Sequence, residues 1–558
     1  MSSSCSSRRR FLQQTAALSL LYQTRQSLSQ TPSQSSQMGS MHPSIHQAPN
    51  APDAHTPMLH LLELPPFVDP LPLPAPLGTP SPCKLTITMR EIHAKIHRDL
   101  PPTRMWSYGP TPLGPVIEAR SGHPLEIEWI NNLPTHHFLP IDYTLHGCGR
   151  ELPQVRTVAH LHGARVPSMY DGYPTDWFPP GHSRTCHYPL QQDAATLWYH
   201  DHAMGLNRLN IYAGLFGMFL LRDKEEDALQ LPNGKYEIPL ILYDRNLTAD
   251  GQLFYATSGD PEHPWIPEFT ADGILLNGKL RPFLDVEPRL YRFRVLNSSN
   301  SRFFGLSLDN KQPLLQIGSD QGLLSTPVAL PSLNLAPAER ADLLIDFTQL
   351  AGQTIHLRTG AFDILQFRVA PSTSQKSTCP SPGVTNLAPP CTPPPQAIPQ
   401  TLRPIRRTPE SDAILTRTIT LNEFQDRIGN PMTMLLNRKH WHEPTTELPK
   451  LNTTEIWEFV NETEDTHPMH LHLVRFQILD RRVFDTFAYQ TDKHMHFRGP
   501  VQPPAANELG WKDTVQCPPG MVTRIIARFE GFPGKYLYHC HILEHESNDM
   551  MRPFEVLA

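Results

Sequence analysis

Four pairs of histidines, each pair separated by one residue, restrict what this chain can fold into. The pairs are His160-Leu161-His162, His200-Asp201-His202, His470-Leu471-His472 and His539-Cys540-His541. On a β-strand the side chains of residues i and i+2 lie on one face, so each pair can direct two imidazoles to the same place. Imidazole is a good ligand for copper, zinc, iron and nickel. Eight imidazoles exceed the needs of one ion, which indicates a metal cluster assembled from distant strands.

A second ligand pattern overlaps the last of these pairs. Cys540, His545 and Met550 follow a Cys-x4-His-x4-Met spacing. A thiolate, imidazole and a weak axial thioether are the ligands of blue-copper electron-transfer sites. His467 is the natural fourth ligand. Because successive side chains of a strand point to opposite faces, Cys540 would face this copper while its two neighbouring histidines face the cluster.

Other metal sites fit these residues less well. Structural zinc is the main rival for clusters of histidine and cysteine. Only Cys540 lies among the histidines and no Cys-x2-Cys pair accompanies it, so structural zinc is disfavoured. A copper nitrite reductase is disfavoured as well, because its mononuclear second site would not use eight histidines.

Together these motifs resemble those of the multicopper oxidases. The segments HLHG, WYHDHA, HPMHLHLV and HCHILEHE are most similar to the branch of bacterial spore-coat laccases and bilirubin oxidases. The resemblance runs from Lys84 to Ala558. Connecting phrases fit it too, including VEPRLYRFRVLN (286–297), LAPAERADLLIDF (335–347) and GWKDTVQ (510–516).

The resemblance implies four copper ions: one of type 1, one of type 2 and two of type 3. Carried over residue by residue, it gives type 1 ligands His467, Cys540, His545 and Met550; type 2 ligands His160 and His470; and type 3 ligands His162, His200, His202, His472, His539 and His541. No ligand position is missing, which disfavours a ligand-less scaffold relative. Glu546 and Asp171 match acidic positions that are associated with proton delivery in this branch.

The pattern of apolar residues predicts an all-β fold. Alternation of apolar and polar residues predicts strands at 125–130, 290–296, 418–421 and 455–460, and an apolar run predicts a buried strand at 211–221. Asn277-Gly278 and Asp250-Gly251 are turn signals, and long helical periodicity is scarce. These features favour β-sandwiches.

The resemblance refines this to three cupredoxin-like, Greek-key β-sandwich domains. We expect them at 84–225, 226–375 and 410–558. The histidine pairs fall in the first and third domains, so the cluster should lie between those two domains. The middle domain would supply docking surface and part of a substrate cleft.

Three further segments differ in composition from the rest. Residues 1–22 contain Ser7-Arg8-Arg9-Arg10-Phe11-Leu12, which has the form of a twin-arginine export signal and predicts a periplasmic or extracellular protein. Residues 23–83, rich in Pro, Ser and Gln, are expected to be disordered, and 376–409 to be a Pro-rich linker. In an exported protein Cys379 and Cys391 could form a disulfide, as could Cys148 and Cys186.

Charge and hydropathy exclude some partners. The net charge is −6, and no Lys/Arg block occurs beyond the extreme N-terminus, so nucleic-acid binding has no support. No apolar run approaches the roughly 20 residues that a membrane-spanning helix needs, so we expect no stable membrane insertion. The protein is expected to be a monomer.

The resemblance implies a laccase-like oxidase. Electrons from phenols, aromatic amines or bilirubin-like substrates would enter through an exposed imidazole edge of His545. They would pass through Cys540 and its neighbouring histidines to the cluster, where O2 is reduced to two waters.

Two alternatives remain open. A metallo-oxidase of Cu(I), Fe(II) or Mn(II) would need a Met-rich or acidic cleft near His545, and the whole chain contains only 16 methionines. A copper-binding scaffold protein would consume no oxygen. Neither the physiological substrate nor the type 1 potential can be read from the sequence.

Overall fold

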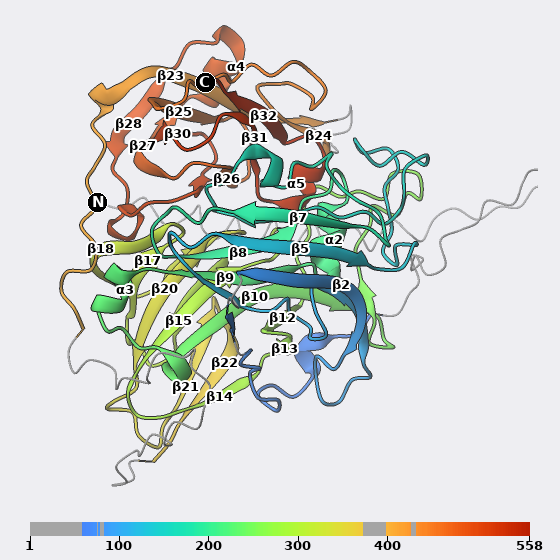
Figure 1. Cartoon of the computed structure of the whole chain (residues 1–558), viewed down its shortest axis with the longest axis vertical. Coiled ribbons are helices and arrows are strands. Elements are labelled where there is room, and N and C mark those ends of the chain that lie inside the picture. Colours follow the sequence, from blue (N-terminus) through green and yellow to red (C-terminus); the bar gives the residue numbers. More distant parts are fainter. Residues whose placement is uncertain (1–57, 75, 79–82, 372–397, 426–430) are drawn as a thin grey trace, which may run out of the picture. The chain divides into compact units, whose positions relative to one another are not determined.

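A computed structural model of the chain describes residues 58–74, 76–78, 83–371, 398–425 and 431–558. Strands dominate it, and the helices are few and short (Figure 1). The predicted export signal, the Cys379–Cys391 pair and most of the Pro-rich linker lie outside the described residues. Within the described ranges, no helix has both the length and the apolar character that crossing a membrane requires.

The first part of the chain forms two sheets. Its strands are β1 Leu77–Gly78, β2 Lys84–Ala94, β3 Thr103–Ser107, β4 Ile117–Arg120, β5 Leu125–Asn132, β6 Ala159–His162, β7 Ser183–Tyr188, β8 Ala195–Asp201 and β9 Phe216–Arg222. One sheet has the order β1-β4-β9-β8-β6 and the other β3-β2-β5-β7. The non-consecutive neighbours are typical of Greek-key sandwiches.

The middle part again forms two sheets. Its strands are β10 Glu237–Leu247, β11 Leu253–Phe254, β12 Gly273–Leu276, β13 Lys279–Leu280, β14 Phe283–Val286, β15 Leu290–Asn297, β16 Phe304–Leu308, β17 Leu314–Ser319, β18 Gly322–Leu330, β19 Leu333–Leu335, β20 Arg340–Asp346, β21 Thr354–Thr359 and β22 Phe362–Val369. The orders are β13-β12-β10-β15-β20-β17-β18, with β11 beside β10, and β14-β22-β21-β16-β19. Side chains from both sheets form one apolar core.

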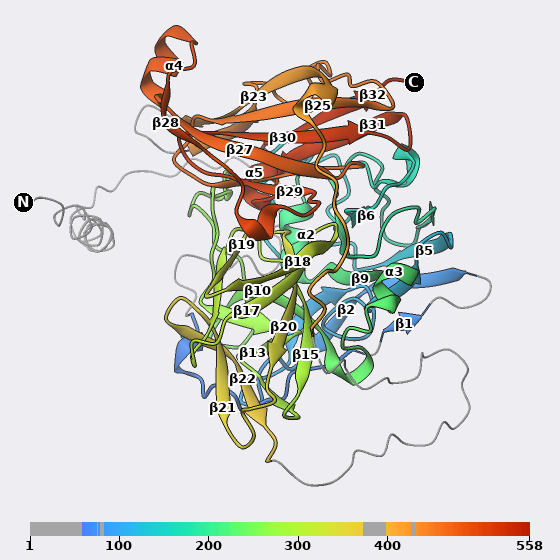
Figure 2. The same ribbon diagram turned by 90° about the vertical axis from the view of Figure 1, so that its left-hand side faces the viewer.

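The last part forms the third pair of sheets, coloured orange to red in Figures 1 and 2. Its strands are β23 Ala413–Gln425, β24 Pro431–Leu436, β25 Thr453–Asn461, β26 His467–Leu471, β27 Phe476–Phe484, β28 Phe497–Gln502, β29 Thr514–Cys517, β30 Met521–Phe529, β31 Gly534–Cys540 and β32 Met551–Val556. The orders are β24-β23-β25-β30-β27-β28 and β29-β26-β31-β32. The predicted cupredoxin-like, all-β architecture is therefore confirmed. The predicted domain limits themselves remain predictions.

The helices lie in connections between strands. They are α2 Asn207–Ala213, α3 Lys224–Ala228, α4 Thr486–Asp492 and α5 Leu543–Ser547, with single 3-10 turns η1 Leu61–Glu63, η2 Ser168–Tyr170, η3 Gly234–Tyr236, η4 Glu410–Asp412 and η5 Ala506–Glu508. α4 extends from the edge formed by β27 and β28 (Figure 2). α5 follows β31 directly and carries one of the predicted metal ligands.

One apolar core runs through the first and third pairs of sheets. It contains Trp129 and Trp198 from the first pair and Trp457, Leu471 and Tyr538 from the third. Burial of large apolar side chains across this boundary is the main favourable term in holding the two parts together. Packed in this way, β6 and β8 are held close to β26 and β31, and these four strands carry most of the predicted ligands.

The four alternating segments are confirmed as strands: they lie in β5, β15, β23 and β25. The Asn277-Gly278 signal is confirmed too, since it forms the tight turn between β12 and β13. Asn277 has φ 49° and Gly278 has φ 90°. Positive φ at both central residues is the requirement of the two-residue turns that join antiparallel strands.

The buried strand predicted at 211–221 is wrong in its first half. Ile211 to Ala213 form the end of α2, and only the residues from Phe216 onward form β9. Gly214, with φ 124°, ends the helix. All of α2 is buried, so its apolar residues show no amphipathic period that would distinguish a short helix from a strand.

Two other predictions are corrected by the structure. Residues 58–74 fall in the segment expected to be disordered, yet Leu61 and Leu71 are buried in apolar cores and the Leu71 N–H donates to the Phe283 carbonyl at 2.7 Å. Their apolar side chains outweigh the disorder-prone composition of the segment. Cys148 and Cys186 are both buried free thiols, so that disulfide is not formed.

Candidate metal centre

Strand register brings the histidine pairs together two by two. β6 and β8 are antiparallel, and His160 lies directly opposite His200. β26 and β31 are antiparallel as well, and His470 lies opposite His539. Directly opposed residues have neighbouring side chains on one face of a sheet. Each domain therefore presents a block of imidazoles, and packing of the two domains brings the blocks face to face.

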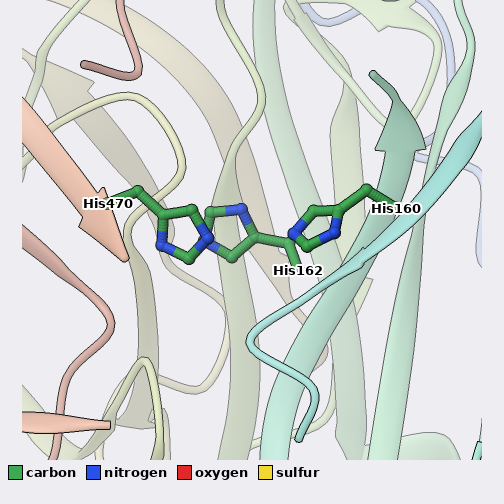
Figure 3. Close-up of side chains that lie close together, drawn as sticks. All are labelled: His160, His162 and His470. Carbon is green, nitrogen blue, oxygen red and sulfur yellow. The ribbon is translucent and has the colours of Figure 1, made fainter. Parts of the chain in front are cut away.

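Three groups of buried histidines form where the blocks meet. The ligand atoms within each group lie within 4.8 Å of one another, and the groups are His160, His162 and His470; His162, His200 and His541; and His202, His472 and His539. Figure 3 shows the first group, with rings from the first and third domains pointing toward one another. All eight predicted cluster histidines are thus brought together.

Backbone carbonyls fix the direction of half of these eight rings. Nδ1 of His200 donates to the Asp201 carbonyl and Nδ1 of His539 to the Cys540 carbonyl, each at 2.9 Å. His470 donates in the same way to the Asp513 carbonyl at 2.8 Å. A proton held at Nδ1 leaves the Nε2 lone pair for a metal ion.

His162 has the opposite orientation. Its Nε2 lies 3.1 Å from the Asp513 carboxylate, so its Nδ1 is the nitrogen that faces the cluster. Both terminal nitrogens of Arg340 also donate hydrogen bonds to the Asp513 carboxylate, at 2.8 and 2.5 Å. Burial works to raise the pKa of Asp513, but the Arg340 guanidinium outweighs it and lowers the pKa. Asp513 is therefore a charged acceptor that sets the tautomer of His162.

Asp171 lies between two of the predicted ligands. Its carboxylate accepts from Nδ1 of His472 at 2.7 Å, and its carbonyl accepts from Nδ1 of His160 at 2.5 Å. Gly172 permits this approach: its φ is +87°, and a Cβ there would lie 2.6 Å from the Ala159 carbonyl oxygen. Burial raises the pKa of Asp171 well above 3.8. A buried carboxyl that retains its proton can release it to nearby chemistry.

Glu546 is on α5 and is also buried at the cluster. Its two carboxylate oxygens lie 3.5 Å from Nε2 of His202 and 3.3 Å from Nδ1 of His539. Neither oxygen has a hydrogen-bond partner within the described structure. The structure thus places both predicted proton-delivery residues against cluster histidines.

The predicted type 1 ligands form a fourth group. The Sγ of Cys540 lies 3.5 Å from Nδ1 of His467 and 3.8 Å from Nδ1 of His545, and the two nitrogens are 3.2 Å apart. Met550 is fully buried, and its carbonyl accepts from the Cys540 N–H at 3.1 Å, which holds it beside the group. His467 is further fixed by Thr463, whose hydroxyl is 2.7 Å from its Nε2.

The expected exposed edge of His545 is wrong. His545 has no solvent-exposed surface. The reason is non-local: α5 is covered by the middle domain, where Tyr255 donates to the Glu544 carboxylate at 2.6 Å and Trp265 donates to the Glu544 carbonyl at 3.0 Å. Asn300 and Ser301 donate to the same carboxylate, each at 2.7 Å.

Burial also sets the charge of the ligands. It lowers the pKa of His160 and of His467 to about 3 and that of His541 well below 6.5, so these imidazoles are neutral at physiological pH. Metal ligation requires neutral imidazole. Burial raises the pKa of the Cys540 thiol well above 9.0, so its proton leaves readily only in exchange for a cation at the same place.

The donor atoms fit a set of copper ions. Nε2 of His160, His200 and His470 and Nδ1 of His162 are buried and have no hydrogen-bond partner within the described residues. A buried polar atom without a partner is costly, so four of them at one place indicate a bound ligand. Neutral imidazoles with one thiolate and one thioether are the donor set that copper prefers.

The sequence reading missed the middle domain's part in this centre. The Arg340 side chain is fully buried, and it donates to the Thr196 carbonyl of β8 at 2.9 Å as well as to Asp513. It therefore contacts the first and third domains at once. Its only sequence signal was its position in one of the connecting phrases, LAPAERADLLIDF.

Comparison with known proteins agrees with this geometry. A family model described as multicopper oxidase matches residues 151–226, and another with the same description matches 407–558. The laccase of Bacillus subtilis (strain 168) is 44% identical over 88% of this chain and 98% of its own length. Multicopper oxidase LPR1 of Arabidopsis thaliana is 35% identical over 88% of this chain and 93% of its own. The crystal structure of a laccase from Pediococcus acidilactici Pa5930 superposes with a TM-score of 0.70 at 27% identity, over 88% of this chain and 95% of that one.

Proposed function

Since the chain belongs to the multicopper oxidases and is an oxygen-using oxidase of the laccase type, we propose that its donors are small aromatic reductants: phenols, aromatic amines and bilirubin-like tetrapyrroles. Copper held by the donors described above supplies their one-electron oxidation and the four-electron reduction of O2 to water. The observation that supports electron transfer from such a donor to O2 is the placement of Cys540 in one ligand group while both of its neighbours lie in others.

We assign four copper ions to these residues. His467, Cys540, His545 and Met550 would hold the type 1 ion. His160 and His470 would hold the type 2 ion. The two remaining groups would each hold one type 3 ion through three imidazoles: His162, His200 and His541 in one, and His202, His472 and His539 in the other.

The polypeptide links the electron-accepting site to the cluster. His539, Cys540 and His541 are consecutive, so a few covalent bonds separate the thiol from an imidazole of each type 3 group. The Nδ1–H of His539 also donates to the Cys540 carbonyl at 2.9 Å, which adds a shorter hydrogen-bonded connection. Both connections are buried and fixed, so the distance between the two sites does not depend on side-chain motion.

Protons for water formation would come from the two carboxyl groups at the cluster. Asp171 lies behind His472 and His160, and Glu546 lies beside His202 and His539. They contact different ligand histidines, so protons can be delivered from two sides. Because burial keeps the pKa of Asp171 raised, this residue retains a proton at a pH where an exposed aspartate has lost it.

Substrate would bind outside the layer that covers His545. Tyr255 and Trp265 belong to this layer, and both are bonded to Glu544, the residue before His545. Trp265 retains 8% of its surface exposed. We propose that the donor docks over this layer and that electrons cross it to reach His545.

Oxygen uptake by the copper-loaded protein, with an aromatic dye as donor, tests the function. We expect O2 consumption together with an absorption band near ~600 nm from thiolate-bound copper. Cys540→Ser should remove both, whereas Cys186→Ser, a buried cysteine in β7 outside the ligand groups, should keep both. A blue protein that consumes O2 with Cu(I), Fe(II) or Mn(II) but not with the dye would establish the metallo-oxidase alternative. A colourless copper-loaded protein would refute the assignment of Cys540.

We further propose that the protein is exported through the twin-arginine route to the periplasm or exterior and acts as a monomer. The Ser7-to-Leu12 pattern supports the export route. Replacement of Arg8 and Arg9 by lysine, followed by cell fractionation, tests it, and size-exclusion chromatography with light scattering tests the monomer.

A further inference from the structure

A second group of histidines lies at the surface, apart from the four ligand groups. His440 donates from Nδ1 to the Asp549 carboxylate at 2.7 Å. Nδ1 of His146 faces the other oxygen of the same carboxylate at 3.4 Å. His442 is the third imidazole of the group. His146 belongs to the connection between β5 and β6 in the first domain, and the other members belong to the third.

The spacing of these rings matches that of the ligand groups. The centroid of His442 is 5.7 Å from that of His440 and 5.9 Å from that of His146. Ring pairs in the ligand groups have centroids 5.1 Å apart for His467 and His545, and 6.0 Å apart for His160 and His470. The His442 ring is therefore as close to the other two rings as paired rings of the metal centre are to each other.

The loop that carries two of these histidines is rigidly held. Arg552 has no exposed surface, and its guanidinium donates to the backbone carbonyls of residues 440, 441, 443 and 444. The bond to the carbonyl of Pro444 is 2.7 Å long and that to Glu443 is 3.1 Å long. The Arg552 guanidinium thus fixes the backbone on both sides of His442. A loop fixed in this way loses little conformational entropy when it binds an ion.

Asp549 prepares the imidazoles for a ligand. An ionised carboxylate can only accept, so Nδ1 of His440 carries the proton and its Nε2 carries the lone pair. A carboxylate that receives the second nitrogen of a histidine is the usual outer partner of a metal ligand. Solvent can reach the group, because 32% of the His146 side chain and 47% of the His440 side chain are exposed.

We propose that His146, His440 and His442 form a further metal site that binds a divalent cation of borderline softness, such as Zn(II), with Asp549 as the outer carboxylate. Three imidazoles and a water suit the coordination of Zn(II). The site would join the first domain, through His146, to the third domain. Its Asp549 directly precedes Met550 in the sequence. A cation there would strengthen the docking of the two domains that build the oxygen-reducing cluster.

Titration calorimetry of the copper-loaded protein with Zn(II) tests this site. We expect a binding event that His442→Ala and His440→Ala each weaken by at least about 10- to 100-fold, the loss that removal of even an outer partner of a metal ligand causes. His187→Ala is the matched control, because His187 is also exposed and lies 3.2 Å from a carboxylate, that of Glu126. Histidines elsewhere in the chain contribute equally to every variant. The visible absorption of each sample reports whether the copper sites are retained.

Thermal unfolding gives the second readout. Zn(II) should raise the melting temperature of the parent protein and of His187→Ala and have little effect on the two cluster variants, because a ligand stabilises only the fold that binds it. Equal Zn(II) affinity in the parent and His442→Ala would overturn the proposal. So would tight binding that leaves the melting temperature of the parent unchanged, since the bound Zn(II) would then not be held by a site that exists only in the folded chain.

Discussion

At the scale of single residues, the centre is a set of fixed tautomers. Most cluster histidines have Nδ1 held by an oxygen, and His162 is reversed because Asp513 receives its Nε2. The choice of nitrogen is therefore determined by neighbours outside the ligand set. Removal of such neighbours typically lowers metal affinity or activity by about 10- to 100-fold. Asp171 differs from the other neighbours because it can also carry a proton.

The two roles of Asp171 can be separated by substitution. Asp171→Asn keeps an oxygen that can accept from His472 but removes the titratable proton. We expect O2 turnover with the dye to fall by about 100-fold, the lower end of the usual contribution of proton transfer. Copper content and the visible band should not change. Asp171→Ala should lose copper as well, because His472 is then not oriented. Full turnover in Asp171→Asn would show that Asp171 only orients the ring.

At the scale of secondary-structure elements, short helices connect the domains through charge. α3 follows β9, and its Glu226 lies against Arg292 and Arg294 of β15 in the middle domain. The distance between Glu226 and Arg292 is 2.6 Å, and all three side chains are buried. Burial alone would raise the pKa of Glu226, but these arginines and Arg222 outweigh it and lower the pKa to about 2.

This pairing predicts an acid-sensitive contribution to stability. The pKa of Glu226 is about 2 in the fold and 4.5 when unperturbed, so the contribution is fully present above pH ~4.5 and is lost as the pH falls toward 2. The difference corresponds to roughly 3 kcal/mol. In urea unfolding followed by tryptophan fluorescence, Glu226→Gln should have a lower free energy of unfolding than the parent at pH 5. The difference between the two free energies should narrow as the pH falls. Glu225→Gln, at an exposed neighbour, is the control. A difference in the free energy of unfolding that is constant with pH would contradict the pairing of ionised Glu226 with these arginines.

At the scale of the whole molecule, the middle domain holds the other two in register. Arg340 donates to Thr196 of the first domain and to Asp513 of the third, and its side chain is fully buried. The Glu544 carboxylate of α5 receives three further bonds from the middle domain. The domain that supplies none of the predicted ligands therefore positions ligands on both sides of the centre.

Removal of the Arg340 guanidinium should destabilise the fold and its metal centre together. Arg340→Met leaves the buried Asp513 carboxylate without its partner, and breaking a buried pair in this way costs about 3–5 kcal/mol. We expect the free energy of unfolding in urea to fall by this amount and the copper content to be lower. The double variant with Asp513→Asn should be less destabilised than the sum of the single variants, since no unpaired charge remains. Strict additivity would show that the two residues do not act as a pair.

Sequence reasoning succeeded where spacing alone carries the information. The i, i+2 histidine pairs predicted side chains on one face of a strand, and the structure brings all eight together. It failed where the cause is distant in the chain. The burial of His545 depends on Tyr255 and Trp265, almost 300 residues away. The described segment that contains Leu71 depends on its contact with Phe283. No local pattern in the sequence indicates this contact or the burial of His545.

The position of the ligands along the chain also determines when metal can bind during synthesis. The first and second histidine pairs emerge from the ribosome long before the segment from His539 to Met550. Each predicted type 3 group and the type 1 group contains a member of that segment. Of the predicted groups, a nascent chain that has passed His472 but not reached His539 has all its ligands only for the type 2 ion, His160 and His470. Completion of the oxygen-reducing centre therefore follows translation of the third domain, and a prematurely terminated chain lacks the connection through Cys540 that would make bound copper catalytically active.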